Sequence, residues 1–339
     1  MRDIVYLQSC PNDYYYSWQT HLWLESLREI GKSYKAISAI FVPQGREFNN
    51  KHWENIQKLY PEATFKFYEQ THNLNPLLQL YVPIIRPYIL IKLFKEHPEL
   101  SEKAVLYTDC DIFFNKNFNI DKYLDDDICY LSDTNSYINA SYFDSKIKDV
   151  LPSKLEEYKQ IDVLNEATKI AGISREVAEK YNLHSGGAQY LLKNIDWQFW
   201  DKMMSDTLNI RKYLQGINRY YFESEDKGIQ TWCSDMFSLL WNLWATDKET
   251  QIIPEMEFAW SSDPITKLDK PNIGIFHNAG IVSEFQGDIP VFYKGKYHNG
   301  LNPFKDPHLD EVFNNEKSKT LANWYYVSKM IQLREKYSL

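Results

Sequence analysis

Two carboxylates separated by one residue are the groups in this chain whose spacing most clearly suggests chemistry. Asp109 and Asp111 follow directly after the apolar run of residues 104–107. A short apolar run bounded by polar residues is typical of a buried strand, and open α/β sheets bind their ligands at the carboxyl ends of strands. Neighbouring carboxylates repel each other, and their oxygens suit hard cations such as Mg²⁺ and Mn²⁺. The pattern therefore predicts a divalent metal site, which such ions commonly share with a substrate diphosphate.

The spacing Asp-x-Asp is short and also occurs by chance in acidic chains. The run Asp125-Asp126-Asp127 contains the same spacing and is more typical of a solvated turn. Around Asp109 and Asp111 the chain is apolar on both sides, since Ile112-Phe113-Phe114 follows. An exposed loop is not expected to be flanked in this way, so the sequence favours a functional site there.

Four further clusters follow downstream, and each also has an ordinary structural interpretation. Gly186 and Gly187 precede an apolar strand that contains Gln189, and paired glycines allow a close backbone approach to a ligand or simply a tight turn. Asp235 lies on the polar side of a predicted helix over residues 229–244, where it would face either a substrate or solvent. In that helix the predicted apolar face includes Trp232.

The last two clusters supply a nitrogen ligand and a positive charge. His277 ends the apolar run of residues 273–276, with Gly280 three residues later. Neutral imidazole binds ions such as Mn²⁺, although a histidine at the end of a strand is often structural. Lys294 lies among aromatic residues and a glycine, and lysine binds phosphate as a point charge; a lysine that blunts an exposed hairpin edge is the alternative.

The elements that must position these groups alternate in the first half of the chain. Strands are predicted at residues 4–8, 36–42, 64–68, 104–107 and 128–131, with helices at 17–30 and 87–94 between them. Such alternation predicts a mainly parallel, Rossmann-like sheet flanked by helices. A polar helical insertion is expected at about residues 151–181. A terminal helix is expected at 320–336, which packs on the body or contacts a partner or a membrane surface.

Composition limits the class of protein. The 339 residues carry a net charge of −8, which argues against a nonspecific nucleic-acid binder. No apolar stretch approaches the roughly 18 residues of a membrane span, and the early apolar run is expected to be the first strand rather than a signal peptide, so we expect a cytoplasmic protein. Ten Trp and 25 Tyr residues suit sugar binding as well as a core.

Taken in order, these motifs resemble those of metal-dependent glycosyltransferases with the GT-A fold. The succession of Asp-x-Asp, a small-residue turn, an acidic helix, His-x-x-Gly and a lysine is similar to the glycogenin and galactosyltransferase-like group. Phe276-His277-Asn278-Ala279-Gly280 and Phe292-Tyr293-Lys294-Gly295-Lys296-Tyr297 also resemble plant peptidyl hydroxyproline arabinosyltransferases and serine galactosyltransferases. The chain departs from the pattern at His184-Ser185-Gly186, which replaces Asn-x-Gly, and at Asp235-Met236, which replaces Asp-Gln.

The resemblance implies a single large GT-A catalytic domain over residues 1–305. Residues 1–135 would be its nucleotide-binding half and 136–305 its acceptor and metal half, followed by a helical extension over 306–339. It implies Mn²⁺ or Mg²⁺ held by Asp109, Asp111 and His277. The donor would be bound by Gln8, Ser9, Arg86, Asp109, Cys110, Gly186, Gly187, Gly280 and Lys294. Asp235 and Gln189 would be the catalytic residues.

The expected activity is transfer of a hexosyl or pentosyl group from a nucleotide-diphosphate sugar, preferably a UDP-sugar, to a hydroxyl of a glycan, a protein or a small molecule. The motif order favours retention over inversion at the anomeric carbon. Three alternatives stay open at this point. They are a nucleotidyltransferase with the same metal-diphosphate site, a noncatalytic sugar- or nucleotide-binding protein, and an acceptor that is a modified DNA base, which the net charge disfavours.

Overall fold

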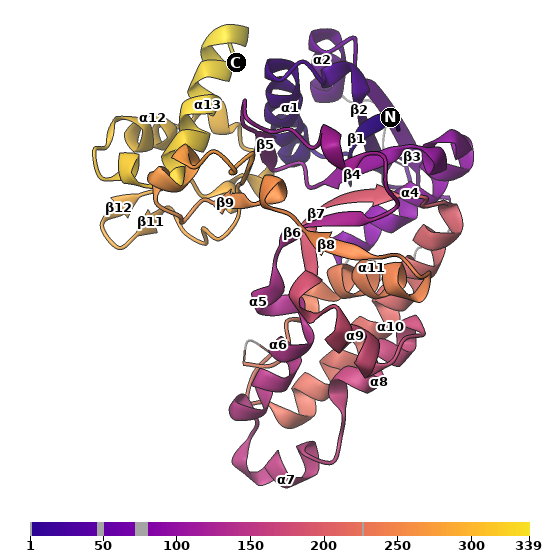
Figure 1. Cartoon of the computed structure of the whole chain (residues 1–339). Helices are drawn as coiled ribbons and strands as arrows, with labels where there is room; N and C mark the ends of the chain where they lie inside the picture. The colour runs from indigo at the N-terminus through magenta and orange to yellow at the C-terminus, as the bar shows by residue number, and fades with distance from the viewer. Residues whose placement is uncertain (1, 46–50, 72–80, 226) are drawn as a thin grey trace. The chain divides into compact units, whose positions relative to one another are not determined.

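The computed structural model describes residues 2–45, 51–71, 81–225 and 227–339 (Figure 1). Contacts between Cα atoms divide the chain into two compact units, each built from three separated segments. Unit 1 comprises Met1–Val5, Gln70–Tyr107 and Lys122–Ile253, and unit 2 comprises Tyr6–Glu69, Thr108–Asp121 and Pro254–Leu339. The functional division expected from the sequence, with boundaries at residues 135 and 305, stays a prediction.

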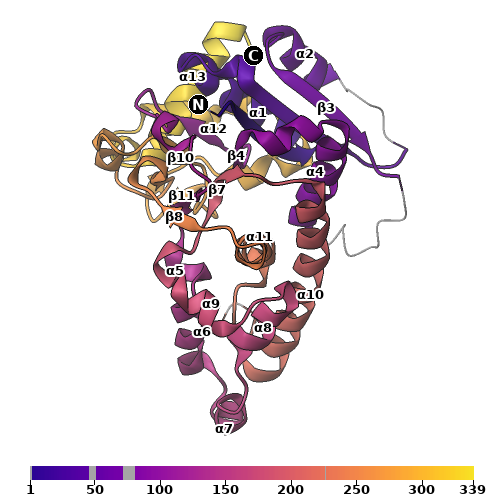
Figure 2. The ribbon, with the colours of Figure 1, turned by 45° about the vertical axis from the view of Figure 1, so that its right-hand side comes forward.

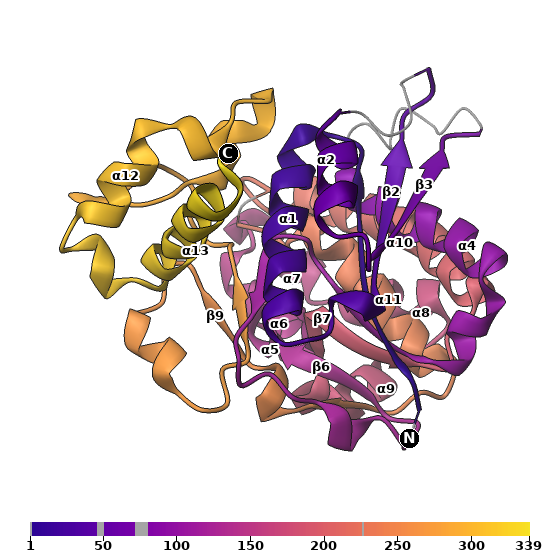
Figure 3. The ribbon, with the colours of Figure 1, turned by 90° about the horizontal axis from the view of Figure 1, so that it is seen from above.

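Unit 2 contains the first strands of the chain. Strands β1 (Ile4–Pro11), β2 (Ala36–Val42) and β3 (Thr64–Glu69) pair in parallel, in the order β3-β2-β1. Helices α1 (Tyr14–Glu29) and α2 (Lys51–Leu59) connect them, and Figure 3 shows both helices beside these strands. Asp13 caps α1 by accepting a hydrogen bond from the Tyr15 amide at 2.8 Å, which fixes where the helix begins.

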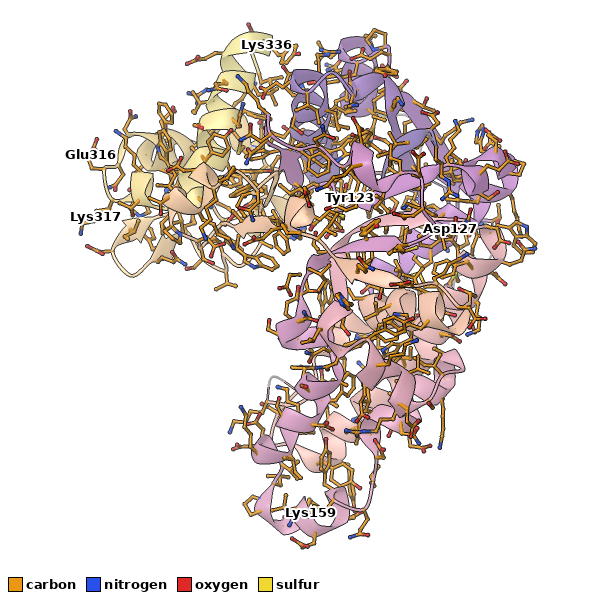
Figure 4. The ribbon with its side chains drawn as sticks, viewed as in Figure 1. Tyr123, Asp127, Lys159, Glu316, Lys317 and Lys336 are labelled. Carbon is orange, nitrogen blue, oxygen red and sulfur yellow. The ribbon has the colours of Figure 1, made fainter. Side chains whose placement is uncertain are left out.

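Unit 2 also holds a small second sheet with the strand order β5-β10-β9. Its strands are β5 (Ile112–Phe114), β10 (Ile275–His277) and β9 (Phe258–Trp260); β10 is antiparallel to β5 and parallel to β9. The hairpin β11 (Phe285–Gln286) and β12 (Ile289–Pro290) and helices α12 (Pro307–Asn314) and α13 (Ala322–Tyr337) complete the unit. Figure 4 labels Glu316 and Lys317 between α12 and α13, and Lys336 near the end of α13.

The core of unit 2 is largely aromatic. Phe113 of β5 stacks on Phe276 of β10 and on Tyr326 of α13, with ring centroids 4.9 Å and 5.8 Å apart. All three side chains are at most 1% exposed. The terminal helix α13, for which the sequence left a partner or membrane contact open, therefore packs on the body of its own unit through Tyr326.

Unit 1 carries strands β4 (Ala104–Thr108), β7 (Gly186–Lys193), β6 (Cys129–Asp133) and β8 (Thr250–Ile252) in that spatial order. Strand β7 is antiparallel to both β4 and β6, whereas β6 and β8 are parallel. The strand order of the whole sheet is β3-β2-β1-β4-β7-β6-β8. The expected mixed α/β class, with a mainly parallel sheet flanked by helices, is confirmed.

The helices of unit 1 are α4 (Ile85–Glu96), α5 (Asn135–Ile138), α6 (Ala140–Ser145), α7 (Leu155–Tyr158), α8 (Val163–Ala171), α9 (Arg175–Lys180), α10 (Trp197–Tyr221) and α11 (Ser234–Ala245). Helix α10 contacts α4, α8 and α11 (Figure 2). The expected helical insertion corresponds to α7, α8 and α9. Among the described residues, no helix combines the length and the apolar character needed to cross a bilayer.

The predicted helix over residues 229–244 begins later than expected. A short 3-10 helix, Thr231–Cys233, precedes α11, so Trp232 lies outside the apolar face and its side chain is 62% exposed. Of the two alternatives for Asp235, a side chain that faces solvent is excluded. Asp235 is 7% exposed, and Ser238 and Asn242 are fully buried because α11 packs against other helices on this side too.

Candidate metal centre

Strand pairing in the small sheet brings the two aspartates and the histidine of unit 2 together. Strand β5 starts one residue after Asp111, and the register places His277 of β10 opposite Ile112. The amide of Asn278 donates a hydrogen bond to the Asp111 carbonyl oxygen at 2.9 Å, which continues the pairing past the strand end. Residues separated by more than 160 positions thus meet because β5 and β10 are neighbours.

The three side chains present their polar atoms to one small volume. His277 Nε2 lies 3.4 Å from an Asp111 carboxylate oxygen and 3.7 Å from an Asp109 carboxylate oxygen. One ligand atom from each residue falls within 4.8 Å of the others. Asp111 and His277 are buried, at 7% and 6% exposure, while Asp109 is partly exposed. The triad is therefore shielded on one side and open on the Asp109 side.

The histidine is held in place by its neighbours in the sheet. The indole of Trp260, which lies opposite His277 in the register between β9 and β10, stacks on the imidazole with centroids 5.2 Å apart. The ring of Phe276 is buried in the aromatic core directly before it. A ring fixed in this way keeps Nε2 directed at the carboxylates, as a metal ligand needs.

Lys294 supplies the positive charge of the centre. It begins the 3-10 helix Lys294–Asn299, and its Nζ forms an ion pair with an Asp111 carboxylate oxygen. Burial alone would raise the pKa of the Asp111 carboxyl, but Lys294 and His277 outweigh it and hold that pKa well below its usual range. Asp111 is therefore ionised near neutral pH, which is the state that binds a cation.

The same 3-10 helix makes a second contact beside the centre. His298 stacks on the ring of Tyr15 with centroids 3.8 Å apart and planes 24° apart. Tyr15 lies in the first turn of α1, next to the capping residue Asp13. Burial lowers the pKa of the His298 imidazole, and the Lys294 charge acts in the same direction. One short helix thus places Lys294 against the Asp111 carboxylate and the His298 imidazole against the Tyr15 ring.

The donor set fits a hard or borderline divalent cation. Two carboxylates and one imidazole match Mn²⁺, and the carboxylates match Mg²⁺. Cys110 is not suited to join them, because burial raises the pKa of its thiol well above the usual value and keeps it neutral. Gly280, three residues after His277, adopts a φ of +87°, so the turn there favours a residue without a side chain.

Two other predicted residues of unit 2 lie on β1. Gln8 is fully buried and its amide nitrogen donates to Thr20 Oγ1 at 3.1 Å, while Ser9 is 6% exposed. Both residues are therefore covered by the core on at least one side. Their predicted contact with a nucleotide base stays a prediction.

The predicted residues of unit 1 form their own arrangement. Asp235 pairs with Arg86, with 3.5 Å between a carboxylate oxygen and a guanidinium nitrogen. The Tyr81 hydroxyl lies 3.0 Å from the other Asp235 oxygen and accepts a hydrogen bond from the Asp235 amide at 3.1 Å. Tyr81 was not identified from the sequence, because a lone tyrosine before Val82-Pro83 carries no pattern.

The remaining predicted residues lie on β7. A Cβ on Gly186 would come within 2.4 Å of the Ser132 carbonyl oxygen and 2.5 Å of Leu131 Cβ, so this glycine permits close packing on β6. A Cβ on Gly187 would meet Met236 and Tyr190 side-chain atoms. Gln189 is fully buried in the strand.

No protein-family model matches the chain, and no curated protein sequence is detectably similar to it. Among solved structures, the bifunctional glycosyltransferase WbbM aligns with 97% of this chain and 52% of its own, at 10% identity and a TM-score of 0.42. The chain thus spans about half the length of that protein. Mouse xyloside xylosyltransferase 1 aligns with 81% of this chain and 97% of its own, at 11% identity and a TM-score of 0.36.

The galactosyltransferase LgtC, in complex with donor and acceptor sugar analogues, aligns with 84% of this chain and 90% of its own, at 12% identity and a TM-score of 0.41. Likenesses at these TM-scores do not establish a shared activity.

Proposed function

We propose that this protein is a metal-dependent glycosyltransferase of the GT-A type that uses a nucleotide-diphosphate sugar, preferably a UDP-sugar, and transfers the sugar to a hydroxyl acceptor. The observation that carries this proposal is the convergence of Asp109, Asp111 and His277 with Lys294. Carboxylates and an imidazole that surround a small volume suit a divalent cation, and a lysine beside them suits the diphosphate that such a cation binds.

Each residue of the centre has a defined part in this proposal. Asp111 and His277 hold Mn²⁺ or Mg²⁺, and Asp109 binds the cation or the ribose from the more open side. When bound, the metal supplies positive charge for the leaving diphosphate. Lys294 pairs with Asp111 in this structure. Once the cation neutralises that carboxylate, the ammonium group of Lys294 would pair with the diphosphate instead.

The other predicted residues keep their proposed roles. Gln8 and Ser9 contact the nucleotide, together with Cys110 and Gly280 near the metal. In unit 1, Arg86, Gly186 and Gly187 bind the donor, Gln189 faces the donor sugar, and Asp235 orients the sugar or the acceptor. A retaining outcome and a cytoplasmic location are further parts of the proposal, which come from the sequence. A glycan, protein or small-molecule hydroxyl is preferred as acceptor over a modified DNA base because of the net charge of −8.

A screen of nucleotide-sugar donors tests the proposal. The protein is incubated with UDP-, GDP- and ADP-linked sugars and Mn²⁺, and release of the nucleoside diphosphate is followed with and without a chelator. We expect Mn²⁺-dependent release from at least one donor. Diphosphate release from a nucleoside triphosphate instead would indicate a nucleotidyltransferase, and binding of donors without turnover would indicate a noncatalytic protein.

A further inference from the structure

Trp232 is a large apolar side chain that unit 1 leaves in contact with solvent. Its side chain is 62% exposed, whereas Tyr81 beneath it is 1% exposed. The two rings meet edge to face, with centroids 5.6 Å apart and planes at 83°. An edge contact supports the indole while leaving much of its surface available, which is the geometry of a platform rather than of a core residue.

The platform is fixed through its backbone. The Tyr81 hydroxyl donates to the Trp232 carbonyl oxygen at 2.7 Å and also lies 3.0 Å from an Asp235 carboxylate oxygen. Burial raises the pKa of the Tyr81 hydroxyl well above its usual value, so it stays protonated and can keep donating. A backbone held in this way, with the indole edge against Tyr81, lowers the entropy cost of stacking a ligand on the side chain.

Charged planar groups accompany the indole. The Asp235 carboxylate lies three residues after Trp232 and pairs with Arg86, whose side chain is 33% exposed. The guanidinium of Arg211 lies 4.4 Å from the centre of the Tyr81 ring, and its Nη1 donates to Thr231 Oγ1 at 3.4 Å. Guanidinium and carboxylate groups are planar, and they donate to or accept from pairs of neighbouring hydroxyl groups.

We propose that Trp232 and Asp235 form a saccharide-binding subsite of unit 1. The apolar C–H face of a pyranose or furanose ring would stack on the exposed indole, and a hydroxyl group of the ring would donate to the Asp235 carboxylate. A ligand with one apolar face and a polar edge matches both features at once, which a purely apolar or purely anionic ligand does not. Binding of a saccharide does not depend on the proposed function. The identification of that saccharide as the acceptor does rest on it.

Binding is tested first, because it needs no turnover. The indole N–H resonance of Trp232 is identified by comparison with Trp232→Phe, and the protein is titrated with methyl β-galactoside, methyl α-glucoside and methyl β-xyloside. A single stacking subsite gives millimolar affinity at best, so titration runs to about 50 mM. At least one glycoside should shift this resonance saturably. If none does, or if uridine alone shifts it, the saccharide subsite is refuted.

Kinetics then tests the acceptor assignment. Trp232→Ala should raise the KM for a saccharide acceptor about tenfold with a smaller change in kcat, and Trp232→Tyr, which keeps a flat ring, should recover part of the loss. Tyr34→Ala, which removes an aromatic side chain of unit 2 that is 63% exposed, is the matched control and should leave this KM unchanged. An unchanged acceptor KM in Trp232→Ala, or a rise in the donor KM instead, overturns the assignment.

The two proposals fail in different ways. If the unaltered protein releases no nucleoside diphosphate from any donor, the glycosyltransferase proposal fails, while the titration still decides whether Trp232 binds a saccharide. If donor turnover is present and the glycosides leave the Trp232 resonance unchanged, only the subsite fails.

Discussion

At the scale of single residues, Asp111 has one cationic partner in the structure and a second in the proposed function. Its carboxylate pairs with Lys294 in this structure, and the same carboxylate belongs to the candidate metal triad. An ammonium and a divalent ion compete for the same oxygen atoms, and a unit charge at close range near a protein surface is worth about 4 kcal/mol before desolvation is subtracted. In the proposed function, Lys294 therefore weakens metal binding and also binds the diphosphate.

Removing this lysine should separate the two effects. Lys294→Ala should strengthen Mn²⁺ binding roughly tenfold, because the competing charge is gone, and should lower turnover of the donor because the diphosphate loses a cation. Calorimetric titration with Mn²⁺ measures the first and diphosphate release the second. Lys296→Ala is the control, since Lys296 lies in the same short helix but pairs with Glu284 and Asp306. Equal Mn²⁺ affinity in Lys294→Ala and the unaltered protein would contradict the competition.

His277 should have the opposite effect on metal binding. Replacing it with alanine removes the nitrogen ligand, so His277→Ala should raise the Mn²⁺ concentration needed for half-saturation about tenfold or more. A proton competes with the metal for the imidazole lone pair, so acidification should weaken Mn²⁺ binding in the unaltered protein more than in His277→Ala. Identical Mn²⁺ titrations would return His277 to a purely structural role.

The residue types of the centre could be predicted from the sequence, but their partners could not. Asp109, Asp111 and His277 were identified by their positions at strand ends, and the structure brings them together. The pairing of Lys294 with Asp111 and the exposure of Trp232 depend on how distant segments pack. Local patterns carry no information about such contacts, and the apolar character of Trp232 suggested burial.

At the scale of elements, most strands of the first half were predictable because they are short, largely apolar runs between polar turns. Strand β3, with the sequence Thr-Phe-Lys-Phe-Tyr-Glu, is the exception to this apolar pattern, and its residues are partly or fully exposed. The longest helix, α10, was not predicted. Its buried positions include Asp206, Thr207 and Asn218, which break the apolar period that identifies a helix. Two of them bond to other segments: Asn242 of α11 donates to Asp206 at 2.9 Å, and Asn218 donates to the Ile229 carbonyl oxygen at 2.7 Å. The Thr207 hydroxyl instead donates to the Met203 carbonyl oxygen of its own helix at 2.7 Å.

Two glycines of unit 1 should respond in opposite ways to the addition of one methyl group. Gly186→Ala places a Cβ against the backbone of β6, so unfolding should require about 1–3 kcal/mol less free energy. Gly216 lies inside α10 with nothing within 4 Å of a new Cβ, so Gly216→Ala should add about 0.5–1 kcal/mol. Chemical denaturation of both variants measures this. A Gly186→Ala protein as stable as the unaltered one would mean that β6 and β7 do not pack this closely.

At the scale of the whole molecule, each unit is assembled from three separated chain segments. The three residues of the candidate metal triad come from the second and third segments of unit 2. Neither the first nor the second half of the sequence therefore contains all three. Because the segments interleave, each compact unit contains residues from both sides of position 135. The class of the fold was predictable because strand and helix alternate locally, whereas the assignment of segments to units requires long-range contacts.

Stability of the molecule should depend on pH through His21 of α1. Burial lowers the pKa of its imidazole to about 4; the Glu25 charge opposes this shift, whereas the charges of Arg28 and Lys336 act in the same direction as burial. In the unfolded chain the pKa is about 6.5, so the unfolded state takes up a proton first as pH falls. The contribution of His21 to the free energy of unfolding is therefore fully present above about pH 6.5. It is lost as the pH falls toward 4, by about 3 kcal/mol at most.

Replacement of His21 tests whether this histidine is a source of the loss of stability in acid. His21→Phe keeps a ring beside Tyr60 and Tyr337 but cannot take up a proton. The difference in unfolding free energy between about pH 7 and about pH 4.5 should therefore be smaller in His21→Phe than in the unaltered protein. If both proteins lose the same free energy over this interval, the acid sensitivity comes from other groups.

The central claim is that the triad holds a divalent cation that binds a nucleotide diphosphate. Calorimetric titration of UDP, with and without Mn²⁺, tests it most directly in the unaltered protein, in Asp111→Asn and in the control Asp127→Asn. Asp127 belongs to the second acidic run, where it pairs with Arg2 in unit 1. We predict that Mn²⁺ strengthens UDP binding at least about tenfold in the unaltered protein and in Asp127→Asn, and has little effect in Asp111→Asn. Mn²⁺-enhanced UDP binding that survives in Asp111→Asn would contradict the account.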